Sequence, residues 1–462
     1  MKKNYITKNK TKLALYAGAT ALAALAPQIH AQSSDALIDK LVDKGVLTVD
    51  EAKDLRVEAD KNFNTALQAK TGMPDWVTGY KIGGDFRGRF EQFSGENKAL
   101  TDRTRERYRI RLGVTVNMLD NMEAGFRLGS SDATKINNSS VSAGNPNSGN
   151  STMQDNFSKK MVYIDAAYGK WTAVNGGDWL LAATVGKMDN PFVFTPMVFD
   201  PDLTPEGAAV TGSYTINDQH SVAFAGAAFV LDEESSNTHD PFMYGGQVVL
   251  NSKWNQKLAS SLGLGGFEIV SPEQLSVTNV PTVNLGNTRR LSGKYAGSPL
   301  YNFNPIIADA SVTYTLDSFP MFNGAFPIKL AGEFINNPAA PNNNNGYWAG
   351  ITFGKSGTKK TWDLSYRYEY LEANAWYDQM VDDDNGAFYQ HKPGFPSSAS
   401  GYFGGTNVKG HLIKFNYSFT DSLTFTTSCF INDLIKSSLS QATGGEPKSS
   451  AIHVMADLMW KF

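Results

Sequence analysis

Arginines recur at every second position in one stretch of the chain, residues 103–118. Apolar residues fill the alternate positions: Tyr108, Ile110, Leu112, Val114 and Val116. A period of two indicates a β-strand with one polar and one apolar face. The guanidinium groups would repeat at about 6.6–6.8 Å along the polar face, where they could bind phosphate, organic anions or the hydroxyl groups of sugars. Because crowding cations in a dry core is unfavourable, this face is expected to meet water.

Two neighbouring segments, residues 80–92 and 123–131, show the same alternation. The arginines on the three polar faces are predicted to line a water-filled channel: Arg87, Arg89, Arg105, Arg107, Arg109, Arg111 and Arg127. Asp85 and Glu91 share the polar face of the first segment and could neutralise part of this charge. An alternative interpretation places some arginines, above all Arg103 and Arg105, at an extracellular rim in contact with lipopolysaccharide or loops.

Residues 188–206 form a stiff segment rich in proline and phenylalanine. An exposed loop with so many apolar residues would be poorly solvated. Folding inward against a barrel wall would bury them and direct four constriction-loop carboxylates into the lumen: Asp189, Asp200, Asp202 and Glu206. These carboxylates would face the arginines across the channel, and the transverse field would order water and polar solutes. The alternative is a loop that packs on a neighbouring subunit or on another external loop.

The sequence carries no catalytic motif. Its six histidines show no metal-binding spacing such as HExxH, and neither a GxSxG nucleophile motif nor a P-loop occurs. The one cysteine, Cys429, cannot form an internal disulfide. We therefore expect no catalytic residue, no metal site and no cofactor, with an outer-membrane barrel enzyme as the alternative class. The formal net charge of −3 gives no reason to expect nucleic acid as a partner.

Alternation with a period of two continues from residue 79 to residue 462. About sixteen segments can be placed, most of them near the roughly 9–11 residues of a tilted membrane-spanning strand. They cover residues 80–92, 103–118, 123–131, 161–168, 178–187, 207–216, 221–231, 242–251, 258–270, 305–316, 328–336, 347–355, 361–371, 410–420, 422–433 and 451–462. The connections alternate between short and long, which is typical of a membrane barrel with short periplasmic turns. The predicted fold class is an all-β, transmembrane, antiparallel up-and-down β-barrel, because a soluble sandwich has no reason to sort its loops by length.

The first 78 residues follow a different pattern. Residues 1–31 have the basic start and short apolar stretch of a secretory signal peptide. Residues 32–78 are predicted to be a periplasmic helical segment, in which Thr48 and Glu51 form a capping box. This segment could be a short coiled coil that sets an oligomer, a spacer, or a contact to the cell wall. Residues 79–462 would form the barrel, and an even strand number would place both its ends in the periplasm.

The last strand, residues 451–462, alternates apolar and polar residues and ends in Phe462. This end resembles the terminal strand that the bacterial barrel-assembly machinery recognises. Together with the signal peptide, it predicts a Gram-negative-type outer membrane, with lipid and lipopolysaccharide as surroundings. Aromatic residues make up 12% of the chain, and those on apolar strand faces suit the boundaries between membrane and water.

Two parts of the sequence resemble a known family. Residues 186–192 (GKMDNPF) and 200–207 (DPDLTPEG) together resemble a signature of outer-membrane porins. Residues 44–52 (KGVLTVDEA) are similar to the periplasmic prefix of that family and of phosphate-selective porins. The resemblance implies a pore-forming barrel that assembles as a homotrimer, and it names no solute. The expected function is passive diffusion of small hydrophilic solutes or ions, and the alternative is a channel selective for anions, phosphate or oligosaccharides.

Overall fold

The computed structural model describes residues 74–96, 102–135, 142–235, 238–275, 286–386, 405–436 and 450–462, with a few single positions between 38 and 72. The chain divides into two compact units, Met1–Thr78 and Gly79–Phe462. The predicted signal peptide and most of the predicted helical segment lie outside the described residues. Among the residues that are described, no helix is long and apolar enough to cross a membrane.

The capping box of the first unit has formed. The backbone N–H of Glu51 donates to Thr48 Oγ1 at 3.2 Å, and the backbone N–H of Thr48 donates to Glu51 Oε2 at 2.9 Å. The Glu51 carboxylate accepts from the backbone N–H of Thr48 and also from its hydroxyl at 2.8 Å, and these two bonds hold the pKa of Glu51 below its usual value. The reciprocal bonds satisfy two backbone donors that the start of a helix leaves free.

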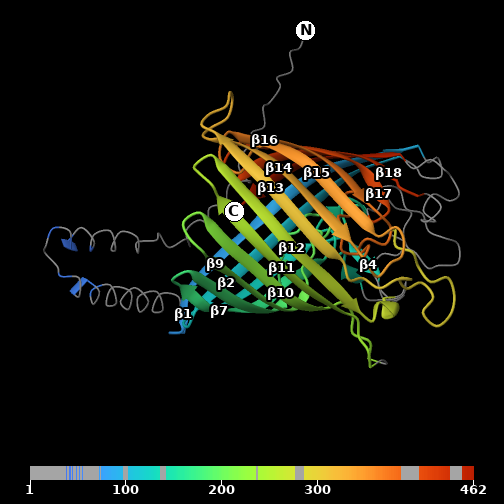
Figure 1. Cartoon of the computed structure of the whole chain (residues 1–462), viewed down its shortest axis with the longest axis horizontal. Coiled ribbons are helices and arrows are strands. Elements are labelled where there is room, and N and C mark those ends of the chain that lie inside the picture. Colours follow the sequence, from blue (N-terminus) through green and yellow to red (C-terminus); the bar gives the residue numbers. More distant parts are fainter. Residues whose placement is uncertain are drawn as a thin grey trace, which may run out of the picture. The chain divides into compact units, whose positions relative to one another are not determined.

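The second unit is a closed antiparallel barrel with sixteen long strands among the described residues (Figure 1). The first eight are β1 (Val77–Gly95), β2 (Arg103–Met118), β3 (Met122–Ser130), β7 (Val162–Gly176), β8 (Trp179–Lys187), β9 (Glu206–Thr215), β10 (His220–Val230) and β11 (Phe242–Lys253). The other eight are β12 (Leu258–Val270), β13 (Ile306–Leu316), β14 (Phe326–Asn336), β15 (Asn345–Gly354), β16 (Thr361–Leu371), β17 (Val408–Ser418), β18 (Leu423–Leu434) and β19 (Ala451–Lys461). Each strand pairs with the next, and β1 also pairs with β19 and so closes the ring. The predicted fold class is confirmed.

Three short strands lie in the connection from β3 to β7. β4 (Ala133–Lys135) pairs with β5 (Ser142–Gly144), while β6 (Ser151–Thr152) pairs with β2. A short 3-10 turn, η2 (Pro272–Gln274), follows β12.

Strand β7 is longer than the segment 161–168 that the alternation predicts. Its pairing register shifts twice, once opposite Arg127 and Leu128 of β3 and once between Thr172 and Val174 of β7 itself. Each such bulge reverses which residues face inward. The alternation of inward and outward residues therefore changes phase inside β7. For this reason the pattern predicts only the first half of the strand.

Short connections gather at one end of the barrel, because the chain is strictly antiparallel and all but one of the connections at that end are short. The connections at this short-turn end are residues 119–121, 177–178, 216–219, 254–257, 317–325, 355–360 and 419–422, and 317–325 is the one longer loop. Five tryptophans lie at this end of their strands or in the turns: Trp171, Trp179, Trp254, Trp362 and Trp460. Four of them are exposed. Tryptophan gathers where a membrane surface meets water, so the short-turn end has the composition of one membrane boundary.

The barrel interior is partly filled by two of the long connections, residues 188–205 and 372–386. Met197, Val198 and Trp376 from these loops are fully buried against inward-facing strand residues such as Ile307 and Ile335. Glycines in the wall admit the loop: a Cβ at Gly245 would lie 2.7 Å from Phe192, and one at Gly265 would lie 2.8 Å from Phe194. The apolar part of the first loop is thus packed inside its own barrel.

Candidate functional site

The polar faces of β1 and β2 turn inward. On β2, Arg107 and Arg109 are each only 4% exposed, while Ile110 and Leu112 between them are 43% and 45% exposed. Because neighbouring side chains on a strand point to opposite faces, this contrast separates an interior polar face from an exterior apolar one. We call Arg105, Arg107, Arg109 and Arg111 the arginine ladder.

The arginine ladder is paired with carboxylates of the adjacent strand. Asp85 of β1 binds Arg109 Nη2 at 2.9 Å and Arg111 Nε at 2.8 Å. Glu91 of β1, which is fully buried, binds Arg105 and also Arg107 Nη1 at 3.3 Å. These contacts neutralise most of the ladder within its own wall.

The remaining predicted arginines also have carboxylate partners. Arg89 contacts Asp457 of β19 through two hydrogen bonds of 2.7 and 2.8 Å, across the junction that closes the barrel. Arg87 lies 3.9 Å from the same carboxylate. Arg127 of β3 contacts Asp165 of β7.

The four predicted loop carboxylates have different surroundings. Asp189 binds Arg127 at 2.6 Å, and Asp202 binds Arg109 at 3.0 Å. Glu206 binds Lys187 at 3.0 Å at the exposed start of β9. Asp200 is 2% exposed, and its carboxylate accepts hydrogen bonds from backbone N–H groups instead of an arginine. Burial and the neighbouring Asp383 carboxylate raise the pKa of Asp200 well above its usual range.

A second inward loop, residues 372–386, was not predicted to contribute to the site. Trp376 Nε1 donates to the carbonyl of Val198 at 2.8 Å, and the backbone N–H of Asp200 donates to the carbonyl of Met380 at 2.7 Å. The two loops are therefore joined by hydrogen bonds. The second loop brings three consecutive carboxylates into the barrel: Asp382, Asp383 and Asp384. That acidic run was a signal in the sequence that could have revealed it.

A cavity of about 620 Å³ lies between the two loops and the wall. Its wall carries six cationic side chains: Arg87, Arg89, Lys329, Arg367, Lys414 and Lys461. Its loops carry five carboxylates: Asp200, Asp202, Asp382, Asp383 and Asp384. The interior therefore has a cationic wall opposite acidic loops. Of the seven arginines predicted to line the channel, Arg87 and Arg89 line this cavity, and the ladder and Arg127 do not.

Four cavity cations were missed by the sequence analysis: Arg367 of β16, Lys329 of β14, Lys414 of β17 and Lys461 of β19. Arg367 contacts Glu369 at 3.2 Å, and we call the other three the lysine group. Among the described residues, lysine ion pairs occur at Lys160, Lys187 and Lys257, and at no member of the lysine group. None of these strands has lysines or arginines at successive alternate positions on one face, so the sequence shows no cluster like the arginine ladder.

Residues 94–276 match a family model described as "Putative porin". A search of curated proteins finds no match. Among solved structures, the chain is similar to the high-pH structure of OprB from Pseudomonas putida, with a TM-score of 0.50 and 12% identity over 83% of this chain and 94% of that one. The low-pH structure of the same protein gives a TM-score of 0.42 and 11% identity over 83% and 93%. A mutant of the Rh. blastica porin gives 0.39 and 10% identity over 83% and 100%.

Proposed function

We infer that this chain, a porin by its family match and its closed sixteen-stranded barrel, forms a water-filled channel for passive diffusion of small hydrophilic solutes or ions. The observation that carries the inference is the charged cavity inside a barrel whose outer face is apolar. A barrel with exposed Ile110 and Leu112 outside and ionised groups inside matches lipid on one side and water on the other.

The cavity charges act as a transverse field. Lys329 and Lys414 of the wall lie opposite the carboxylates of the two inward loops, Asp202 and Asp383 among them. Water and polar solutes orient in such a field, while apolar solutes would lose solvation without gaining contacts. No tight binding site is needed for this discrimination.

Selectivity for anions is the second candidate, and the lysine group favours it. These three ammonium groups have no ion-pair partner among the described residues, so a permeating anion can approach them directly. A phosphate, an organic anion or a sugar acid would fit this chemistry. A neutral oligosaccharide would depend instead on the hydroxyl and amide groups of the cavity.

The surroundings follow from the same proposal. The barrel lies in an outer membrane, with its short turns and the first unit on the periplasmic side, and three copies associate. Lipid and lipopolysaccharide surround it, the barrel-assembly machinery recognises the strand ending at Phe462, and the first unit contacts the cell wall. Crosslinking of purified protein tests the trimer, and protease access in intact cells tests the orientation.

Planar-bilayer recording tests the function. The purified protein should produce discrete conductance steps, and its reversal potential in a potassium chloride gradient should show a preference for chloride. A protein that inserts but produces no steps would overturn the channel. Steps with a preference for potassium would keep the channel and overturn the anion selectivity. Phospholipid or peptide hydrolysis by the same sample would support an enzyme instead.

A further inference from the structure

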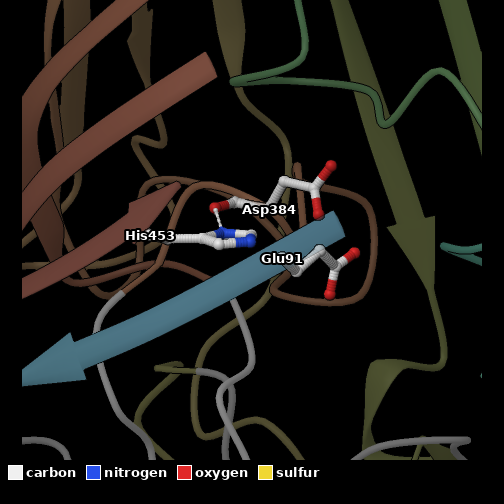
Figure 2. A group of neighbouring side chains, drawn as sticks. All are labelled: Glu91, Asp384 and His453. Carbon is white, nitrogen blue, oxygen red and sulfur yellow. Dashed lines mark hydrogen bonds between the residues drawn. The ribbon is translucent and has the colours of Figure 1, made fainter. Parts of the chain in front are cut away.

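Three residues beside the cavity form a cluster that the channel mechanism above does not require. Glu91 lies on β1, His453 on β19, and Asp384 on the inward loop 372–386. One potential ligand atom from each residue lies within 4.8 Å of the other two. In Figure 2, one ring nitrogen of His453, Nδ1, is hydrogen-bonded to Asp384, and the other, Nε2, points toward the side on which both carboxylates lie.

The ring of His453 is held with one nitrogen free. Its Nδ1 lies 3.0 Å from the backbone carbonyl of Asp384, and a carbonyl can only accept, so Nδ1 carries the hydrogen. The other nitrogen, Nε2, then has a lone pair and no hydrogen on the neutral ring. His453 is 4% exposed, and within the part of the chain that the structure describes Nε2 has no hydrogen-bond partner. Buried polar atoms normally have a hydrogen-bond partner, so the free lone pair of Nε2 is a candidate for binding a ligand.

Two phenylalanines fix the plane of this ring. The ring of Phe93 on β1 stacks on the ring of His453, with 4.0 Å between the ring centroids and 17° between the planes. Phe430 of β18 stacks at 5.6 Å and 21°. Proteins commonly orient a metal-binding histidine by giving one ring nitrogen to a carbonyl and leaving the other for the metal. His453 has that arrangement.

The two carboxylates can accept a further partner. Glu91 Oε1 contacts Arg89 at 3.4 Å and Arg107 at 3.3 Å, Glu91 Oε2 binds Arg105 closely, and Asp384 Oδ2 contacts Arg89 at 3.2 Å. The contacts of Arg89 with Glu91 and Asp384 are long, and Arg89 is held more closely by Asp457 at 2.7 Å. Since each carboxylate oxygen has two lone pairs, Glu91 Oε2 and Asp384 Oδ2 can each bind an ion and keep an arginine contact.

The charges of the ion pairs around the cluster are balanced. Four carboxylates take part in the connected ion pairs: Glu91, Asp384, Asp457 and Asp132. Four guanidinium groups face them: Arg87, Arg89, Arg105 and Arg107. The network therefore has no net positive charge that would oppose a bound cation when His453 is neutral.

We propose that Glu91, Asp384 and His453 bind a divalent transition-metal ion of the zinc type. An imidazole nitrogen with two carboxylates suits Zn²⁺, whereas Ca²⁺ and Mg²⁺ prefer sites made of oxygen alone. Asp384 is half-buried and lines the cavity, so lumen water can complete the coordination. Because Asp384 belongs to a loop and the other two ligands belong to the wall, the bound ion fastens the inward loop to β1 and β19.

Calorimetric titration of the purified full-length protein with Zn²⁺, after treatment with a chelator, tests this site. We expect one ion per chain, and affinity weakened at least about tenfold by Asp384→Asn and by His453→Gln. His411→Gln is the matched control, because His411 is exposed on β17 and is not part of the cluster. This variant should bind Zn²⁺ as the unchanged protein does.

Cobalt gives a second measurement. Co²⁺ bound through His453 should absorb visible light, and this absorption should disappear in His453→Gln. Asp384→Asn keeps the test valid if the histidine variant fails to fold, because Asp384 lies outside the barrel strands. Equal Zn²⁺ affinity in all variants, or no stoichiometric binding by the unchanged protein, would overturn the proposal. Neither the Zn²⁺ titration nor the Co²⁺ absorption depends on ion conduction. Loss of metal binding and loss of the channel function can therefore be told apart.

Discussion

The arginine ladder and the lysine group both point cations into the same barrel, yet they differ in pairing. Every arginine of the ladder contacts a carboxylate, through Asp85 or Glu91. The lysine group lines the cavity without ion-pair partners among the described residues. An opposite charge about 3 Å away cancels most of the field that a more distant solute would experience. The ladder therefore serves mainly to hold strands and loops together, and the lysine group sets the field of the cavity.

The largest expected effect comes from removing the central carboxylate of the ladder. Glu91→Ala leaves Arg105 and Arg107 inside the barrel without this partner. Breaking a buried ion pair in this way should lower the free energy of unfolding by roughly 3–5 kcal/mol. Lys414→Ala should change it by less than about 0.5 kcal/mol. Denaturant unfolding in detergent, with a chelator present, measures both, and equal losses would remove the distinction between the two groups.

A second comparison separates the two faces of the strand that carries the ladder. Leu112→Arg places a charge on the outward face of β2 and should cost roughly 2–4 kcal/mol of barrel stability if the site lies near the membrane centre. Thr115→Arg places the same charge on the opposite face and should be tolerated. The amount of assembled barrel in the membrane fraction measures both. Similar yields of the two variants would contradict the assigned faces.

The ion selectivity should respond to the lysine group more than to the ladder. Lys414→Met removes an unpaired charge from the cavity, whereas Arg111→Met removes a charge whose partner Asp85 stays paired with Arg109. A charge about 4 Å from an ion contributes about 1 kcal/mol in water, so Lys414→Met should shift the permeability ratio several-fold toward cations. Reversal potentials measure this shift. A larger shift from Arg111→Met would assign the field to the ladder.

The smallest expected effect is a dependence on pH at the contact between the loops. Burial, with Asp383, Asp382 and Asp202 nearby, raises the pKa of Asp200 above its unfolded value. The stability that this group contributes is complete below the unfolded pKa of about 4. It is lost as the pH rises through the folded value. Channel fluctuations should therefore increase with pH, and Asp200→Asn should flatten the increase in single-channel recordings. An unchanged pH profile in that variant would exclude Asp200 as the cause.

Local alternation was enough to predict most of the barrel. The bounds of β2, β12 and β16 agree with the predicted segments, and the alternation of β2 and β16 is clear over almost the whole strand. The second half of β7 was missed because bulges change its phase. The packing of residues 188–205 inside the barrel was predictable because Phe192 and its apolar neighbours needed a covered surface.

The arrangement of charges was less predictable. Arg89 and Asp457 are 368 positions apart, and no local pattern relates them. Alternation shows which face a cation occupies, but the partner of that cation depends on strand register and on loops that fold inward. The cluster of Glu91, Asp384 and His453 has the same origin, since residues at such separations form no spacing motif.

The contact between Arg89 and Asp457 also bears on how the barrel is made. Joining segments 368 positions apart costs about 5 kcal/mol of chain entropy, and β19 must be in place before the contact can form. Until then β1 has an unpaired edge, and Arg89 lacks the carboxylate that binds it through two hydrogen bonds. A barrel that lacks β19 would therefore have an open strand edge at β1 and an arginine without its closest carboxylate at the same place. The ion pair at the seam thus stabilises the complete barrel and no shorter one.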